Sequence, residues 1–165
     1  MTLRPLLQWP DKRLRQPSAP VDAITDQIRA IWAEMVKIMD KMPGVGLAAP
    51  QIGEMLQLAV VDASEARDRR ILLANPSILS TSSEEVLGQE ASPNLPGASA
   101  QIKRAKSVTV RYLNQEGIVD RREFHGMEAR SVQHQIDHLA GRMYFDRLSR
   151  VKRDMLLRKA IKGRR

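Results

Sequence analysis

The sequence predicts one compact domain that combines helices with antiparallel strands. Residues 24–39 carry an apolar stripe at helical spacing, and residues 108–124 alternate apolar and polar side chains on either side of a turn. A second helical segment follows at 127–141. The chain has 165 residues and a hydrophobic fraction of 42%, which suits a single core of ordinary size. We therefore expect residues 1–165 to form one domain.

The first twenty residues are predicted to form an extended arm on the domain surface. Prolines recur at Pro5, Pro10, Pro17 and Pro20. Each proline fixes its own backbone and lacks an amide donor, so no regular element fits between them. We expect residues 1–20 to have a structural role.

An amphipathic helix is predicted after this arm. Thr25 is placed to cap its start, and Met42-Pro43-Gly44 ends it, since the residue before a proline avoids helical angles. The apolar stripe consists of Ile24, Ile28, Ile31, Trp32, Met35, Ile38 and Met39.

Residues 44–53 form a run of small residues that exposes backbone. Gln51 is the one side chain in this run that can both donate and accept hydrogen bonds. The glycines lack the lysine of a phosphate-binding loop and are a weak signal by themselves. A tight loop packed beside a strand is the alternative interpretation.

Four short strands are predicted in the middle of the chain. The second is expected to end at Pro76, and a turn at 114–117 joins the last two as an antiparallel hairpin. Residues 88–97 are irregular and rich in proline, which predicts a loop. The strands are Leu56 to Asp62, Ile71 to Asn75, Val108 to Tyr112 and Val119 to Phe124.

The helix expected from about Met127 to Gly141 carries two histidines four residues apart. On a helix, His134 and His138 project from one face, the spacing needed to hold one metal ion. In zinc hydrolases with this spacing, a glutamate after the first histidine takes a proton from water, but here Gln135 follows, and an amide cannot act as that base. Two histidines that are only structural are the alternative.

Two further titratable residues, Asp137 on this helix and His125 before it, indicate less about function. Asp137 is either a hydrogen-bond partner or a surface charge. His125, the third histidine, follows the hairpin, and we expect it to be incidental rather than a further metal ligand.

A basic helix is predicted over residues 149–165, with Ser149 as its cap. Its apolar stripe is partial, and lysine and arginine crowd the rest. The chain has a net charge of +8, which favours acidic partners such as RNA or the ribosome, although a solvated basic face is equally consistent. The partial stripe consists of Val151, Met155, Leu156, Ala160 and Ile161.

The composition excludes several kinds of site and several classes of protein. The chain has no cysteine, which excludes disulfides and thiolate metal ligands. It has neither a run of about 18 apolar residues nor a charged-then-apolar leader at Met1, so we expect no membrane association and a cytoplasmic location.

Three segments in this order resemble the peptide deformylase family: the Gly46-Leu47-Ala48-Ala49-Pro50-Gln51 stretch, the loop opened by Glu90, and the histidine helix. The resemblance covers nearly the whole chain. It implies an α+β fold with antiparallel sheets around a central helix that carries the histidine pair. It also implies removal of the formyl group from the initiator methionine of new bacterial-type chains.

The same resemblance implies a metal site with a substituted ligand. Family members hold iron, zinc or a similar ion through a cysteine and two histidines, and the histidines match His134 and His138. The cysteine falls on Ser92, whose neutral hydroxyl is a far poorer ligand than a thiolate. We expect no metal, or a weakly bound divalent ion such as Fe²⁺ or Zn²⁺.

Two catalytic positions also depart from the family pattern. The acid/base glutamate falls on Gln135, and a backbone N–H that stabilises the oxyanion falls on Pro93, which has none. The remaining oxyanion donor is kept as Gln51.

Three functional hypotheses follow. The first is a deformylase-like protein without efficient activity that binds N-terminal formyl-methionyl or methionyl peptides. The second is a working metal-dependent hydrolase in which Ser92 and another group complete the site. The third is a module that docks on the ribosome through the basic C-terminal helix. The peptide groove of the first hypothesis is formed by Gly44, Val45, Gly46, Leu47, Leu95 and Gly97.

Overall fold

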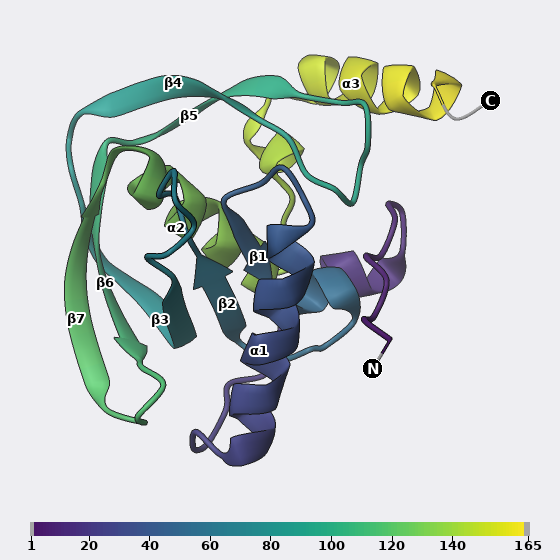
Figure 1. Cartoon of the computed structure of the whole chain (residues 1–165). Coiled ribbons are helices and arrows are strands. Elements are labelled where there is room, and N and C mark those ends of the chain that lie inside the picture. The colour runs from purple at the N-terminus through teal and green to yellow at the C-terminus, as the bar shows by residue number, and fades with distance from the viewer. Residues whose placement is uncertain (1, 164–165) are drawn as a thin grey trace.

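The computed structural model describes residues 2–163, which form two antiparallel sheets around one central helix. The larger sheet has the strand order β1-β2-β3-β6-β7, and the smaller pairs β4 with β5. Figure 1 shows α2 in the middle of the molecule, where it packs against strands of both sheets, while α1 covers β1 and β2. The predicted α+β arrangement around the histidine helix is therefore confirmed. The bounds are α1 Asp26–Asp40, α2 Gly126–Leu139, α3 Arg150–Lys162, β1 Gly46–Ala48, β2 Leu58–Val61, β3 Ile71–Thr81, β4 Glu85–Glu90, β5 Ala100–Ala105, β6 Ser107–Leu113 and β7 Val119–His125.

The helix α1 begins where its cap was predicted. The Thr25 hydroxyl accepts a hydrogen bond from the Ile28 amide at 3.2 Å, which satisfies one of the free donors of the first turn. The predicted stripe faces the core, where Trp32, Met35 and Met39 are almost completely buried. None of the helices formed by residues 2–163 has the length and apolarity needed to span a bilayer.

The predicted hairpin is confirmed as β6 and β7, but the predicted end of the preceding strand is wrong. The strand β3 continues through Pro76 to Thr81 instead of stopping at Asn75. Its pairing with β6 is irregular between Ala74 and Ser77, and Asn75 has a φ of 49°. A proline is tolerated there because the missing N–H falls where the regular ladder is already interrupted.

Two segments predicted to be irregular contain strands. Residues 46–48 form β1, which pairs with β2, and Ala49–Ile52 make a 3-10 helix. Residues 88–90 belong to β4, whose partner β5 was not predicted. Polar and exposed side chains dominate this second pair, so the alternation that indicates a half-buried strand is weak.

The N-terminal arm is not extended throughout, which corrects the prediction. Lys12–Arg15 form a 3-10 helix, and the Asp11 side chain caps it by accepting from the Arg13 amide at 2.9 Å. Leu14 is buried beneath this turn. A Cβ at Gly141, which ends α2 at φ 78°, would lie 2.6 Å from the Arg15 carbonyl oxygen. Glycine is therefore required where the arm crosses the end of α2.

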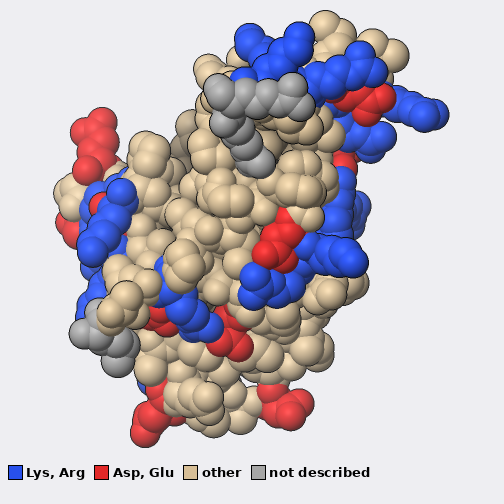
Figure 2. Space-filling view, turned by 90° about the vertical axis from the view of Figure 1, so that its right-hand side faces the viewer, with Lys and Arg blue, Asp and Glu red and all other residues tan. Residues whose placement is uncertain are grey.

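The helix α3 has the predicted Ser149 cap, but most of its apolar stripe is exposed. Val151 and Met155 are 69% and 64% exposed, whereas Ala160 is buried. Figure 2 shows lysine and arginine side chains gathered over the top of the molecule, where α3 lies in Figure 1. The end of the predicted basic tail, Arg164 and Arg165, lies outside the described residues.

Candidate active site

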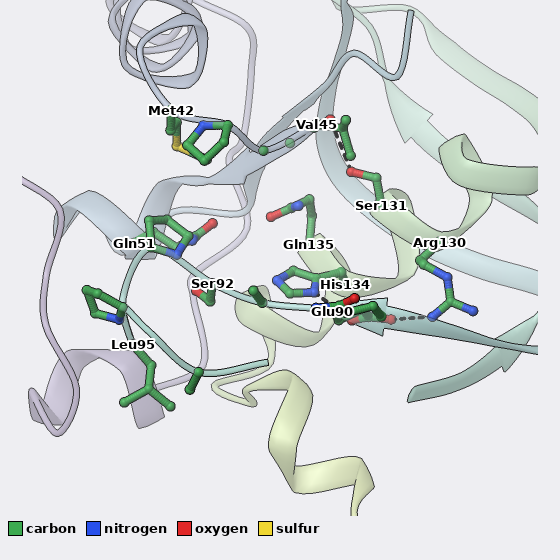
Figure 3. Close-up of a pocket in the computed structure, with 18 of the residues that line it drawn as sticks. Met42, Val45, Gln51, Glu90, Ser92, Leu95, Arg130, Ser131, His134 and Gln135 are labelled. Carbon is green, nitrogen blue, oxygen red and sulfur yellow. Dashed lines mark hydrogen bonds and ion pairs between the residues drawn. The ribbon is translucent and has the colours of Figure 1, made fainter. Parts of the chain in front are cut away.

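A cavity of about 650 Å³ lies between α2, the segment leading into β1, and the loop after β4 (Figure 3). Its lining is mainly apolar, which is typical of a site that takes a small ligand or a side chain. The structure brings ten of the predicted site residues to this one cavity: Gly44, Val45, Gly46, Gln51, Ser92, Pro93, Leu95, Gly97, His134 and Gln135.

Two predicted site residues lie behind the cavity wall. The Leu47 side chain is fully buried and packs in the core with Met35 and Val60, because strand geometry turns it away from the face used by its neighbours. Only the backbone of Leu47 is left to take part in the predicted peptide groove. His138 is 2% exposed and contacts His134 from beneath.

Close approach of β1 to α2 closes one end of the cavity. A Cβ built on Gly46 would lie 2.5 Å from both the Gln135 Nε2 and the Ser131 Oγ. The Ser131 hydroxyl donates to the Val45 carbonyl at 3.2 Å, which ties the two elements together. Glycine at position 46 therefore lets the backbone of β1 lie directly on α2.

The two histidines converge on one point. Their Nε2 atoms are 3.1 Å apart, and two imidazoles bound at 2.0–2.1 Å to one tetrahedral ion would have nitrogens about 3.3 Å apart. His134 is oriented from behind, because its Nδ1 contacts the Glu90 carboxylate at 2.8 Å. A carboxylate in this position is the usual support of a metal-binding histidine.

Glu90 belongs to a buried network of charges that fixes α2 against β4 and β5. Arg104, with a fully buried side chain, donates to both Glu90 oxygens at 2.7 and 2.8 Å and to Asp137 at 2.8 Å. Arg130 donates to Glu90 at 2.6 Å, and Arg147 donates to Asp137 at 2.7 and 2.9 Å. Both carboxylates are thus paired twice, as buried charges require.

This network sets the ionisation of its members. Burial alone would raise the pKa of the Glu90 carboxyl, but hydrogen bonds from Arg104 and His134 hold that pKa well below its usual value. Burial likewise opposes ionisation of Asp137, and Arg147 and Arg104 still lower its pKa. Burial and the neighbouring His134 lower the pKa of His138, so this imidazole is neutral at physiological pH.

On the opposite wall, the Asn94 carboxamide engages the polar groups of Ser92 and Gln51. Its Oδ1 accepts from the Gln51 Nε2 at 2.6 Å and from the Ser92 hydroxyl at 3.0 Å. Its Nδ2 donates to the Leu7 carbonyl at 2.6 Å. The Gln51 Oε1 accepts from the Ala48 amide at 2.8 Å. Asn94 is completely buried and connects three segments of the chain.

Gln135 and Pro93 contribute little hydrogen-bonding capacity of their own. The Gln135 side chain is 4% exposed, and its buried Oε1 has no hydrogen-bond partner among residues 2–163. Pro93 has no N–H, and its carbonyl accepts from the Gln8 side chain at 3.2 Å.

These residues match the metal site implied by the family resemblance only in part. His134 and His138 supply two convergent ligands, and Glu90 supplies the support behind them. The position of the third ligand holds Ser92, a neutral hydroxyl that donates to Asn94. Among residues 2–163, no three histidine, aspartate or glutamate side chains come together as a metal-binding group. The donor set does not make the expected three-ligand site.

The structure bears on two residues that were already named from the sequence. Asp137 is a buried hydrogen-bond partner and not a surface charge, and the His125 side chain is 70% exposed beside Glu123.

Three other residues of this region were given no role from the sequence. Glu90, Arg104 and Asn94 carry no local signal for their roles, because their partners lie far away in the chain. An asparagine two residues after Ser92 was the one available hint, since such pairs form local turns.

Comparison with known proteins agrees with this architecture. The family model described as polypeptide deformylase matches residues 3–154. A protein named peptide deformylase 2 from Xanthomonas campestris pv. campestris is 37% identical over 168 residues, covering 100% of this chain and 98% of its own length.

Solved structures agree as well. A peptide deformylase from Legionella pneumophila has a TM-score of 0.92 at 36% identity, covering 99% of this chain and 96% of its own. A peptide deformylase from Ehrlichia chaffeensis in complex with actinonin has a TM-score of 0.92 at 32% identity, covering 100% and 99%. The chain belongs to the polypeptide deformylase family, a family of metal-dependent hydrolases.

Proposed function

We propose that this member of the family binds N-terminal formyl-methionyl or methionyl peptides in the cavity and does not deformylate the formylated ones efficiently. The proposal rests on the chemistry and the hydrogen bonding of the side chains that line the cavity. The Ser92 hydroxyl and the Gln51 amide are both hydrogen-bonded to Asn94, and Gln135 presents a neutral amide. One of the three metal ligands and the base that activates water are replaced, and the remaining oxyanion donor, Gln51, is hydrogen-bonded to Asn94.

The expected loss of rate is large. Removing a general base typically lowers a rate by about 10²–10⁴. Removing one oxyanion donor lowers it by roughly another 10²–10³. These factors do not simply multiply when residues act as a unit. Even the smaller one alone leaves activity far below that of a complete site.

Peptide binding depends on features that the chain retains. The cavity of about 650 Å³ is mainly apolar, as expected of a pocket for a methionine side chain. The segment from Gly44 to Gly46 lies along its rim, where an extended peptide could pair with exposed backbone groups. The related structure from Ehrlichia chaffeensis holds actinonin. We propose the cytoplasm as the location, since newly made chains are the source of such peptides.

A set of reversions tests the proposal. We expect the triple variant Ser92→Cys, Pro93→Leu, Gln135→Glu to gain metal and deformylase activity, and each single change to gain little. Adding Asn94→Ser should raise activity further, since it releases Gln51 and the side chain at position 92 from Asn94. Deformylation of formyl-Met-Ala-Ser and metal content are measured after supplying iron, zinc, nickel or cobalt.

The same assay can contradict the proposal. Wild-type protein that deformylates as fast as the revertants would show that the site is complete without these changes. A quadruple variant that binds metal and stays inactive would show that the cavity itself has diverged. Calorimetry that detects no binding of any methionyl peptide at millimolar concentration would remove the binding part.

A working hydrolase with altered chemistry is the alternative. The convergence of His134 and His138, supported by Glu90, favours it. It predicts stoichiometric metal in purified protein and deformylation that a chelator abolishes. Protein that stays inert after each of the four metals is supplied contradicts it.

The basic helix α3 supports a second role in ribosome association. Its exposed Val151 and Met155 stand among lysines and arginines, as on a surface that contacts both RNA and protein. Truncation after Ser149 should then abolish cosedimentation with ribosomes at low salt, and added salt should weaken the association of the full chain steeply. Unchanged sedimentation of the truncated chain contradicts this role.

A further inference from the structure

The rim segment of the cavity, residues 42–46, has little regular structure of its own. It follows α1 and leads into β1, and only its last residue, Gly46, belongs to a strand. Gly44 is a second glycine in this segment, and glycine loses the most conformational freedom when its backbone is ordered. Figure 3 shows Met42 and Val45 on one side of the cavity and Leu95 on the other. Contacts from other segments must therefore keep this side of the cavity in shape.

The turn between β2 and β3, residues 62–70, supplies such contacts. The Asp62 amide donates to the Val45 carbonyl at 2.9 Å, and the same carbonyl accepts from the Ser131 hydroxyl. The Arg67 guanidinium donates to the Gly44 carbonyl at 2.6 Å and, over a longer 3.5 Å, to the Asp62 carbonyl. Arg67 thus ties a glycine of the rim segment to the end of β2.

Arg67 has a backbone conformation that an arginine rarely adopts. Its φ is 56°, in the left-handed region where the Cβ crowds the following carbonyl oxygen and where glycine or asparagine is favoured. A residue keeps such a conformation when the surrounding contacts hold it there, and residues of this kind cluster at active sites and ligand clamps. The contact that this backbone makes possible is the one between the guanidinium and Gly44.

A role in pairing the buried Asp62 carboxylate does not account for Arg67. The Ser64 amide donates to the Asp62 Oδ1 at 3.0 Å, and the Ser64 hydroxyl donates to the same oxygen. Burial opposes ionisation of Asp62, and these hydrogen bonds from Ser64 lower its pKa more than the Arg67 charge does. Arg67 is therefore a minor support of this carboxylate, and its shortest hydrogen bond goes to the rim segment.

We infer that Arg67 is a positioning residue of the proposed peptide site, which holds the rim segment in the shape that a peptide binds. This inference rests on the proposed function, since it concerns the same cavity. The residues that line the cavity do not include Arg67, so it acts through Gly44 and not by touching the ligand. A rim that is already ordered loses less conformational freedom when an extended peptide pairs with it, which raises the affinity.

The variant Arg67→Asn separates a role in binding from a role in folding. Asparagine tolerates the left-handed conformation, so the strain is relieved while the bond to Gly44 is lost. Calorimetry should show about tenfold weaker binding of both Met-Ala-Ser and formyl-Met-Ala-Ser, because the rim segment must then be ordered by the peptide. The melting temperature should change by less than about 4 °C.

Two further variants serve as controls. Arg69→Asn removes the same charge from an exposed position of the same turn and should change neither the affinity nor the melting temperature. Arg67→Lys keeps a cationic donor on a long side chain, and its affinity should stay within about threefold of the wild-type value.

Amide hydrogen exchange on the free chains tests the same inference without a ligand. Exchange at residues 44–47 should be at least about tenfold faster in Arg67→Asn than in the wild-type chain, while exchange in β6 should be unchanged. Faster exchange in β6 as well would mean that Arg67 supports the whole fold, and it would overturn the inference.

The peptide measurements give the other decisive outcomes. Undiminished affinity of Arg67→Asn, with a wild-type chain that binds normally, overturns the inference and leaves the proposed function intact. Weaker binding without faster exchange at residues 44–47 also overturns the inference. A wild-type chain that binds neither peptide overturns the proposed function and the inference with it.

Discussion

The two ring nitrogens of His134 face two different regions of the molecule. The polar groups of these two regions are hydrogen-bonded in different ways. On the Nδ1 side, Glu90 and Asp137 are each paired with two arginines, and Arg104 joins them with a fully buried side chain. On the Nε2 side, the side chains of Gln51, Ser92 and Gln135 are neutral, and the Gln135 Oε1 has no hydrogen-bond partner among residues 2–163. The first region holds α2 in place, and the second lines the cavity.

This difference indicates that the residues that hold the site in place can be separated from the residues that would react. A buried charge that loses its partner destabilises the fold strongly, so the residues behind His134 depend on one another. A neutral residue on the cavity wall whose side chain is not hydrogen-bonded to other segments has no such dependence and can change with little effect on folding. The histidine pair can therefore keep its geometry while the reacting groups in front of it differ.

The largest expected effect comes from breaking the charged side. Arg104→Met should lower the free energy of unfolding by about 3–5 kcal/mol, since it leaves Glu90 and Asp137 buried with one partner fewer. Urea denaturation measures the loss. Arg121→Ala, at an exposed position on β7, is the matched control and should change stability by less than about 0.5 kcal/mol. If the two changes lowered the free energy of unfolding by similar amounts, the buried charge network would contribute no more to stability than an exposed side chain does.

An intermediate effect is expected from Asn94. Asn94→Ala should lower the free energy of unfolding by about 2–3 kcal/mol, because the Gln51 amide and the Leu7 carbonyl lose their buried partner. Thermal and urea denaturation with Gln115→Ala as control give the comparison. A loss no larger than that of the control would show that these groups find other partners.

The smallest effect, with the opposite sign, is expected at Gln135. Gln135→Met should leave stability unchanged or raise it by up to about 1 kcal/mol, since it replaces an unsatisfied buried oxygen with an apolar group of similar length. A loss of more than about 1 kcal/mol in the same denaturation assay would place Gln135 among the supporting residues, and the distinction between the two sides would fail.

Local signals explain which parts of the fold the sequence predicts. The start of α1 at Thr25 and that of α3 at Ser149 follow from capping side chains next to helical segments, and the hairpin follows from alternation around a turn. The pair β4–β5 has no such signal, because few of its side chains are buried. The passage of β3 through Pro76 depends on an irregular register that only the partner strand reveals.

The candidate site shows the same limit. The positions of His134, Ser92 and Gln51 follow from the order of three segments that resemble one family, and the structure brings them to one cavity. The roles of Glu90 and Asn94 depend on partners 14 to 87 residues away. No pattern along the chain indicates such pairings, since they arise only when distant segments pack together.

Asn94 also ties the beginning of the chain to the segments that form the cavity wall. Its side chain donates to the Leu7 carbonyl, its own carbonyl accepts from the Trp9 amide at 2.8 Å, and the Leu7 amide donates to the Gln51 carbonyl at 2.8 Å. An affinity tag or fusion partner that pulls residues 2–9 from the surface would thus alter the pocket without touching α2. Ligand measurements on this protein therefore call for a tag at the other end or a tag that has been cleaved.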